Sequence, residues 1–244
     1  MNNLYWQYDE TTEYWAKKLL LPIKSMHPIP QYDGMDYRLW EDTWKKHILK
    51  DSFPEYCQYP NEEESLLCSQ SNIIHCFRDQ KLLEGLVLTV AWGRMTRSKG
   101  KIYQKSNQMI EETLYNCLVL IEKTNSIKGS WNLLINRLNW SYVITSKCLH
   151  FLSRSLDYST NPPVPIDNKV IINNVWPKFK EMVNNNFTLG IDSFPEKWWD
   201  YDNSWSSYNR YITAINCWAS TKGWTTTELE STIFDEYYPK TNST

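Results

Sequence analysis

Apolar residues recur every three to four positions along most of the chain, which is the spacing that buries one face of a helix. In residues 35–49, for example, Trp40, Trp44 and Ile48 fall on one stripe. The alternation of apolar and polar residues that is typical of a half-buried strand is nearly absent. The pattern therefore predicts an all-α fold, with about nine to eleven helices for a chain of this length.

The helical period and the capping signals together place most of these helices. They are expected at residues 35–49, 82–95, 107–123, 130–138, 144–156, 167–179, 206–220 and 226–237. The last one begins with a capping box, because Thr225 is followed three positions later by Glu228. Residues 51–66 hold two prolines and an acidic run, so we expect a loop there. A chain of 244 residues fits one large domain best.

Composition excludes several classes of protein. The 13 Trp, 16 Tyr and 7 Phe supply so much buriable surface that disorder is excluded as the main state. Only 7 of the 244 residues are glycine, which disfavours folds that bind nucleotides through glycine-rich phosphate loops. The signature motifs of common metalloproteases, serine hydrolases, P-loop NTPases and dinucleotide-binding enzymes are all missing.

Charge and cysteine usage point to a cytoplasmic protein. The formal net charge of −2 excludes a polycation that coats nucleic acid, although 26 Lys and Arg residues can still form a local basic face. No segment approaches the roughly 18 apolar residues that span a membrane, so no membrane association is expected. The six cysteines contain no C-x-x-C pair and no zinc spacing, which favours reduced thiols. We expect neither a bound metal nor a cofactor.

The candidate chemistry is concentrated in residues 138–179, where Lys147 and Asp167 stand out. Lys147 lies near the start of a predicted helix whose other inward positions are apolar. The helix dipole and the apolar neighbours both disfavour the charged ammonium, and a neutral amine is a nucleophile. Asp167 stands at the predicted N-cap of the next helix, where a carboxylate is favoured and oriented. The same two residues also fit a solvated lysine and an ordinary helix cap.

The segment resembles the helix–hairpin–helix base-excision DNA glycosylase superfamily, in particular its 8-oxoguanine DNA glycosylase branch. In that family a lysine opens the helix after the hairpin, and a V-P-[VI]-D motif follows one short helix later. Lys147 matches the lysine, and Val164, Pro165, Ile166 and Asp167 match the second motif in order and separation. The resemblance implies a two-lobed helical fold, with a core lobe at about residues 78–165 and a second lobe formed by residues 1–77 and 166–244.

The resemblance also implies a mechanism and a partner. A modified purine in duplex or single-stranded DNA would be extruded into a cleft between the lobes. The amine of Lys147 would attack the sugar C1′ and expel the base, while Asp167 stabilises the developing positive charge. The resulting imine would then eliminate the 3′ phosphate. Some prokaryotic relatives occur beside antiviral signalling genes, so a protein partner from a defence operon is implied as well.

The chain departs from the family pattern at two places. The family hairpin is rich in glycine, whereas residues 138–143 read LNWSYV, so the close approach of backbone amides to a DNA phosphate is not expected there. Lys169 stands where the family often has a histidine. Two other functions therefore stay open. One is a glycosylase fold that has lost its chemistry and binds a modified base or a nucleic-acid end. The other is a helical adaptor that docks a protein through its tryptophans.

Further residues are candidates for the same site. Phe151 lies one turn after Lys147 on the same helix face and could stack on a base, as could Trp198. Trp92, Arg94 and Arg97 follow the apolar helix at 82–95 and, with Lys169, could contact DNA. The alternatives are a core phenylalanine, a buried tryptophan and exposed charges at a helix end. We expect His150 and Cys148 to be structural.

Overall fold

The computed structural model describes residues 9–20, 23–28, 35–36, 67–93, 102, 104–157, 163–185 and 204–237. The elements within these ranges are nine α-helices, one π-helix and one pair of two-residue strands. They are α1 (Glu10–Lys18), β1 (Met35–Asp36), β2 (Leu67–Cys68), α3 (Gln70–Arg78), α4 (Leu82–Trp92), α6 (Asn107–Thr124), α7 (Ile127–Leu138), α8 (Tyr142–Ser155), η3 (Asn168–Val175), α9 (Trp176–Asn185), α10 (Trp205–Lys222) and α11 (Thr226–Tyr237). The predicted all-α fold is confirmed.

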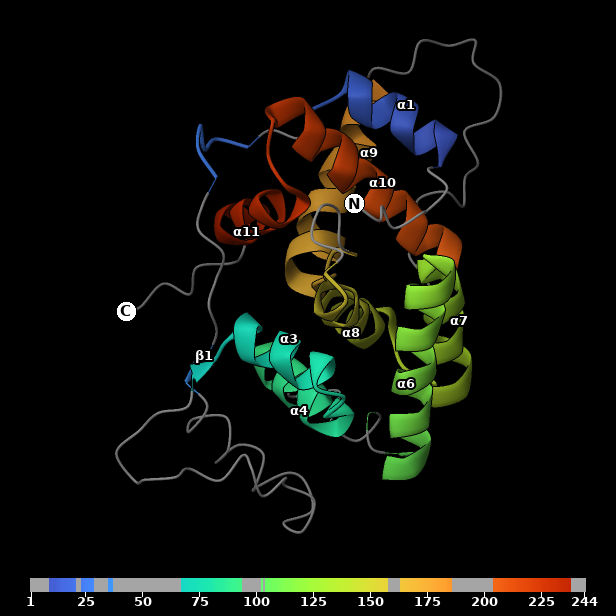
Figure 1. Ribbon diagram of the computed structural model, residues 1–244. Helices are drawn as coiled ribbons and strands as arrows, with labels where there is room; N and C mark the ends of the chain where they lie inside the picture. Colours follow the sequence, from blue (N-terminus) through green and yellow to red (C-terminus); the bar gives the residue numbers. More distant parts are fainter. Residues whose placement is uncertain are drawn as a thin grey trace.

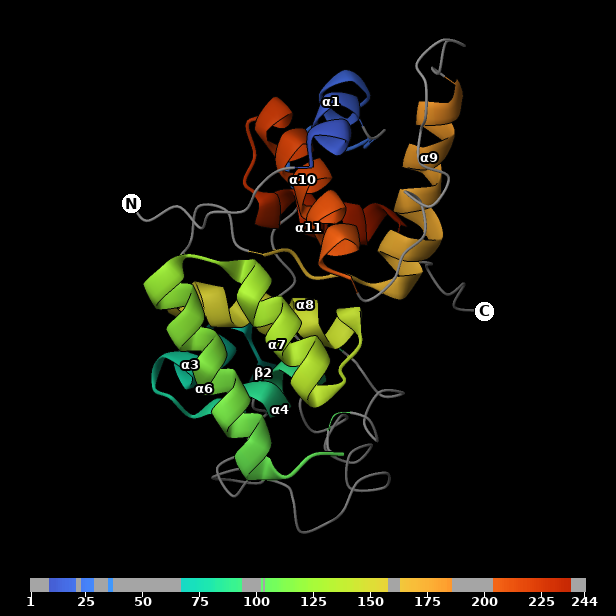
Figure 2. The same ribbon diagram turned by 90° about the vertical axis from the view of Figure 1, so that its right-hand side faces the viewer.

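The described helices pack in two groups, which lie one above the other in Figures 1 and 2. The first group contains α3, α4, α6, α7 and α8. The second contains α1, α10, α11, η3 and α9, and α10 contacts α7 of the first group. Residues 163–167 lie in the chain between α8 of the first group and η3 of the second. The lobe boundaries at residues 77 and 165 stay a prediction. The helix α3 lies almost wholly before residue 77, yet it packs against α4 and α8, which come after that boundary.

Two helices that the sequence pattern did not single out are present near the N-terminal end of the described chain. The helix α1 is capped by Asp9, whose carboxylate accepts a hydrogen bond from Thr12 N at 2.8 Å. The helix α3 is capped in the same way by Ser69, which accepts from Asn72 N at 3.1 Å. Both helices have only nine residues, so their apolar stripes are too short to stand out by period alone.

The helix expected at residues 35–49 does not begin where it was predicted. Met35 and Asp36 form the strand β1, which pairs antiparallel with Leu67 and Cys68 of β2. The partner lies about thirty positions away, so a local period cannot reveal the pairing. Residues 37–49 and the loop expected at residues 51–66 lie outside the described residues.

The helix expected at residues 167–179 divides into η3 and α9. At its start the amide of Ile172 donates to the carbonyl of Asp167 at 3.3 Å, which is the i to i+5 bond of a π-helix. Pro177 has no N–H and its ring crowds the preceding turn, so a regular α-helix cannot run unbroken through it. The change from π to α geometry occurs one residue earlier, at Trp176.

The first group contains one contact that only glycine permits. Gly85 of α4 faces the ring of Phe77 of α3, and a Cβ atom at Gly85 would lie 2.7 Å from Phe77 Cε1. Phe77 is 1% exposed and cannot easily move away. Gly129 of α7 is different, because the nearest atom to an added Cβ would be Leu120 Cδ1 at 3.6 Å.

We therefore expect Gly85→Ala and Gly129→Ala to have opposite effects. Alanine gains about 1 kcal/mol over glycine in a helix, but overpacking costs about 1–3 kcal/mol. Gly85→Ala should lower the free energy of unfolding by about 1 kcal/mol, and Gly129→Ala should raise it by up to about 1 kcal/mol. Urea denaturation of both variants measures this, and stabilisation by Gly85→Ala would contradict the packing of α3 on α4.

Candidate functional site

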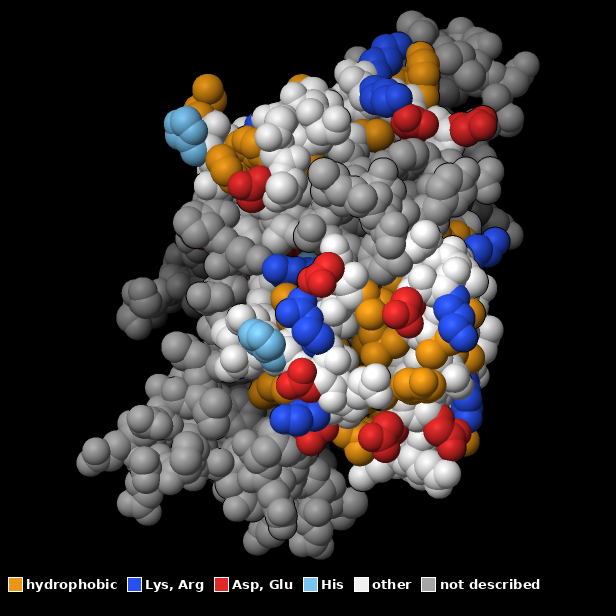
Figure 3. Space-filling model, in the orientation of Figure 1, with side chains coloured by type: hydrophobic (Ala, Val, Ile, Leu, Met, Phe, Trp, Pro, Cys, Tyr) orange, Lys and Arg blue, Asp and Glu red, His pale blue; other side chains and the backbone are white. Residues whose placement is uncertain are grey.

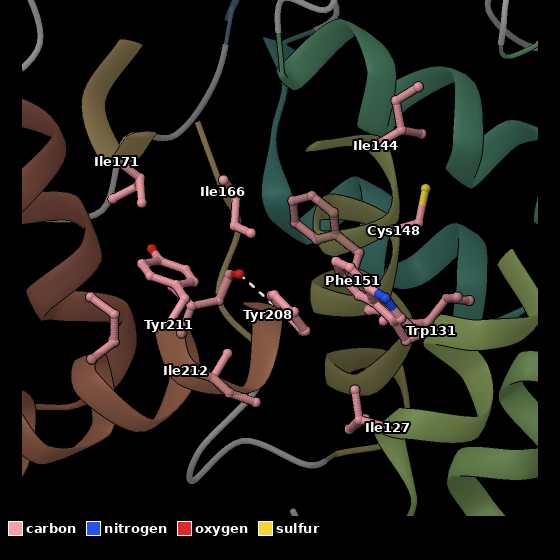
Figure 4. Packing of buried hydrophobic residues seen from close by; sticks show 14 of the residues in the cluster. Ile127, Trp131, Ile144, Cys148, Phe151, Ile166, Ile171, Tyr208, Tyr211 and Ile212 are labelled. Atoms are coloured by element: carbon pink, nitrogen blue, oxygen red, sulfur yellow. Dashed lines mark hydrogen bonds between the residues drawn. The ribbon is translucent and has the colours of Figure 1, made fainter. Parts of the chain in front are cut away.

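The segment before Asp167 is held by four side chains, one for each of its residues. The Nδ1–H of His150 donates to the carbonyl of Pro163 at 2.7 Å, and the hydroxyl of Ser146 accepts from the amide of Ile166 at 2.9 Å. From α10, Tyr208 donates to the carbonyl of Val164 and Tyr211 to that of Pro165, each at 3.1 Å. Figure 4 shows the two tyrosines and Ile166 close together in the packing between the groups.

These hydrogen bonds bring Lys147 and Asp167 together. Ser146 and Ile166 are joined by a hydrogen bond. Lys147 directly follows Ser146, and Asp167 directly follows Ile166, so the two are held near each other. Asp167 is the N-cap of η3, as predicted, because its Oδ1 accepts a hydrogen bond from Val170 N at 3.1 Å. The carboxylate is therefore oriented by the start of a helix, where negative charge is favoured. Its charge acts on Lys147 and raises the pKa of that amine.

The amine of Lys147 lies at the C-terminal end of α4. The side chain is 5% exposed, and its Nζ donates to the carbonyl of Gly93, the C-cap of α4, at 3.2 Å. Nζ also lies 5.7 Å from the ring of Trp92. The ring of Trp92 in turn meets Phe151 edge-on at 5.0 Å. Three of the predicted site residues, Lys147, Trp92 and Phe151, are thus in one cluster with Asp167.

Burial lowers the pKa of Lys147 from its ordinary value, while electrostatic interactions with Asp167, Glu230 and Cys148 raise it and do not overcome the effect of burial. The direction agrees with the prediction, but the expected contribution of the helix dipole does not hold. The helix α8 begins at Tyr142, two residues earlier than predicted, so Lys147 lies in its second turn. A helix dipole acts mainly within the first turn. Desolvation is therefore the main cause.

Glu230 of α11 is a third ionisable member of the cluster, and sequence reasoning missed it. Burial raises the pKa of Glu230 to about 7; the positive charge of Lys147 lowers it, and the negative charge of Asp167 adds to the rise. A sequence signal was available. Thr226, Glu230 and Ile233 stand at helical spacing, and Thr226 and Ile233 are buried, so an acidic residue occupies an inward position.

Of the remaining predicted site residues, some belong to the described part of the chain and others do not. Phe151 is fully buried, so it packs in the core beneath Trp92. The Nε1 of Trp92 is buried and has no hydrogen-bond partner among the described residues. Lys169 belongs to η3, and its side chain lies outside the described part of the chain. Arg94, Arg97 and Trp198 also lie outside it. Base binding and DNA binding by these residues stay predictions.

His150 and Cys148 are structural, as expected. His150 is 2% exposed, and besides its bond to Pro163 it lies 3.4 Å from the guanidinium of Arg154, which also donates to Gln70. Burial and, to a smaller extent, the charge of Arg154 lower the pKa of His150 to about 3, although the hydrogen bond to Pro163 raises it, so the ring is neutral near pH 7. Cys148 is fully buried, and burial raises the pKa of its thiol. It is inert as a nucleophile.

A scan against protein-family models and searches of curated proteins and of solved structures each found no match for this chain. Within the described ranges, no helix combines the length and the apolar character that crossing a membrane requires. No three His, Cys, Asp or Glu side chains of the described residues gather as a metal ion would need. Among the described residues, the Lys147 cluster is therefore the feature that bears on function.

Ser146→Ala tests the bond that brings Lys147 to Asp167. The variant leaves the fully buried amide of Ile166 without its partner, so we expect the free energy of unfolding to fall by about 1–3 kcal/mol. Ser153→Ala is the control, because Ser153 is also fully buried but donates only to His150 O within α8. Chemical denaturation should show a smaller loss for Ser153→Ala. Equal losses would mean that the bond to Ile166 does not hold the segment.

His150 predicts a pH effect on stability. Its pKa is depressed to about 3 in the folded protein, from about 6.5 in the unfolded chain. The unfolded state therefore binds more protons below pH 6.5, and stability falls as the pH falls from 6.5 toward 3. Relative to His150→Asn, the wild type should lose about 2 kcal/mol of unfolding free energy between pH 7.5 and pH 5. Denaturation at the two pH values measures the difference, and a difference near zero would place His150 in water.

Proposed function

We propose that this chain is a DNA N-glycosylase and abasic-site lyase of the helix–hairpin–helix type, which acts in the cytoplasm on an extruded modified purine through an imine on Lys147. The observation that carries the proposal is the buried amine of Lys147, whose pKa is lowered by burial and which interacts with the oriented carboxylate of Asp167. A desolvated lysine beside a fixed carboxylate is the arrangement expected of an amine nucleophile.

Each group has a defined role in the reaction. The lone pair of Lys147 Nζ forms a bond to C1′ of the sugar as the bond from C1′ to the base breaks and its electrons leave with the base. Asp167 stabilises the positive charge that develops on the sugar ring. The amine adduct then opens to an imine, and removal of a C2′ proton expels the 3′ phosphate. We propose that Trp92, whose ring lies near the amine of Lys147 and whose indole N–H has no partner among the described residues, contacts the substrate.

A second function is favoured by one observation. Lys147 donates to the carbonyl of Gly93, so its amine also caps the end of α4, and a cation is favoured at that end of a helix. This role needs no chemistry and fits a module that binds a modified base or a nucleic-acid end. The third function, an adaptor that docks through tryptophans, has less support, because none of the eight described tryptophans is exposed.

The distribution of charged side chains on the surface indicates how the protein would bind nucleic acid. On the face drawn in Figure 3, the described Lys and Arg side chains are interspersed with Asp and Glu. Broad electrostatic attachment to a duplex is therefore not expected from the described residues on that face. We propose a single- or double-stranded DNA partner that is held mainly through the nucleotide at the Lys147 cluster. A protein partner from a defence operon remains part of the proposal.

Borohydride trapping tests the function. An imine is reduced by borohydride to a stable amine, so an oligonucleotide with an abasic site should become irreversibly attached to the protein. The abasic site removes the question of which base is recognised. Lys147→Gln should abolish the adduct and still fold, because its amide can donate to the carbonyl of Gly93. Lys147→Ala should also abolish it. The adduct is measured by denaturing electrophoresis and mass spectrometry.

The variant Asp167→Asn separates the role of Asp167 as a helix cap from the role of its negative charge. Asparagine caps a helix about as well as aspartate, so the variant should fold, yet lose charge stabilisation and release the base more slowly by about 10²–10³-fold. Equal trapping by the wild type and by Lys147→Gln would mean that a surface amine reacts. No trapping by the wild type on single- or double-stranded DNA would favour the binding module.

A further inference from the structure

The indole ring of Trp92 lies beside the amine of Lys147 and is held in place by the core. Lys147 Nζ is 5.7 Å from the centre of the ring, within the distance of about 6 Å at which an aromatic face attracts a cation. The fully buried ring of Phe151 meets Trp92 edge-on at 5.0 Å. Lys147 and Phe151 are one turn apart on α8, so one helix carries both the amine and the residue that supports the ring.

We propose that the face of the Trp92 ring stabilises the positive charge on Lys147 Nζ, first as an ammonium and then as the iminium through which the chain cleaves DNA. The proposal rests on the proposed function for the iminium, whereas the ammonium is present without any substrate. Trp92 is the last residue of α4, and the C-terminal end of a helix also favours a cation.

The reaction needs such a surface because burial acts on every nitrogen at this place. Lys147 is 5% exposed, and burial disfavours its charged form. Burial thus supplies the neutral amine that attacks, but it would also remove the proton from the imine that forms. An imine nitrogen is less basic than an amine, and only the protonated imine withdraws electrons strongly enough for elimination. An aromatic face stabilises the cation without bringing water back to the site.

Solvent water and its protons are the co-reactants of the sequence. The neutral amine bonds to the aldehyde carbon of an abasic site, and a proton moves from nitrogen to oxygen to give a carbinolamine. The nitrogen lone pair then forms the C=N bond as the hydroxyl group leaves with a solvent proton, which gives the iminium and water. Water removes a C2′ proton, and the electrons of that C–H bond pass through a neutral enamine and expel the 3′ phosphate. The nitrogen carries the positive charge before and after this elimination.

The contribution of the ring can be separated from that of the other groups. Among the described residues, the titratable groups that act on Lys147 are Asp167, Glu230 and Cys148. Burial raises the pKa of the Cys148 thiol, so it is uncharged near pH 7. The two carboxyl groups attract any cation at this nitrogen, but they do not respond to the electron density of an aromatic ring. Fluorine substitution on the indole therefore isolates the effect of Trp92.

Site-specific replacement of Trp92 by tryptophans with one, two and three ring fluorines tests the proposal. Fluorine withdraws electrons from the ring face and hardly changes the size of the side chain, so the variants should fold. The pKa of Lys147, followed by heteronuclear NMR, should fall stepwise by about 1 in total, which corresponds to about a tenfold loss of cation stabilisation. The pH profile of strand cleavage on an abasic oligonucleotide should move to lower pH as well, because the amine and the iminium both lose their protons more readily.

The same fluorinated residues at Trp131 are the matched control, because Trp131 is fully buried and stacks on Tyr208 instead. They should change neither the Lys147 titration nor the cleavage profile. Fluorine also makes the indole N–H a stronger hydrogen-bond donor. Cleavage that becomes faster with each fluorine at Trp92, with an unchanged pKa of Lys147, would therefore assign the role to the N–H and overturn the proposal.

The two measurements also separate this proposal from the function on which it rests. If the wild type neither cleaves nor is trapped, the glycosylase and lyase function is rejected, while a stepwise fall in the pKa of Lys147 still supports the ring as the surface that stabilises the cation. If the wild type cleaves but fluorination of Trp92 moves neither the titration nor the profile, the function stands and the role of the ring is overturned.

Discussion

The cluster depends on the attachment of one short segment between the two groups of helices. Residues 163–166 are buried, and buried backbone groups need partners. Their partners are side chains of α8 and α10: His150, Ser146, Tyr208 and Tyr211. The segment is therefore held by α8 of the first group and by α10 of the second group. The ring of Tyr208 also stacks on Trp131 of α7 at 4.1 Å, which ties the same attachment to the packing between the groups (Figure 4).

The sequence revealed the parts of this arrangement that are local. The N-cap role of Asp167 and the capping box at Thr225 and Glu228 follow from residues three positions apart, and the structure confirms both. The lowered pKa of Lys147 was predicted in direction but partly for the wrong reason, since burial replaces the helix dipole. Two of the four attachments of residues 163–166 could not be predicted, because Tyr208 and Tyr211 lie more than forty positions from the carbonyls that they bind. Glu230 is an intermediate case. Its inward position was readable, but its neighbours were not.

Two ionisable groups near the segment respond to acid in opposite ways. His150 has a lower pKa in the folded protein than in the unfolded chain, so acid destabilises the fold through it between about pH 6.5 and pH 3. Glu230 has a folded pKa of about 7, above its ordinary value of 4.5, so the folded state binds its proton first. Acid therefore stabilises the fold through Glu230 between about pH 7 and pH 4.5. The two effects overlap and oppose each other, and the site keeps a neutral imidazole and a protonated carboxyl in mildly acidic solution.

In the proposed reaction, covalent attachment of the amine would also affect the hydrogen bond from Lys147 to the carbonyl of Gly93. An ammonium carries three hydrogens and a protonated imine carries one, which points in the plane of the new double bond. A lysine joined to a sugar therefore has little freedom to keep a donor on Gly93, and the carbonyl of this C-cap residue of α4 would lose its hydrogen bond. The hydrogen bonding at the end of α4 would then depend on whether a nucleotide is covalently attached to Lys147. It would change when the adduct forms and recover when the product leaves, without any contact between that helix end and the nucleotide.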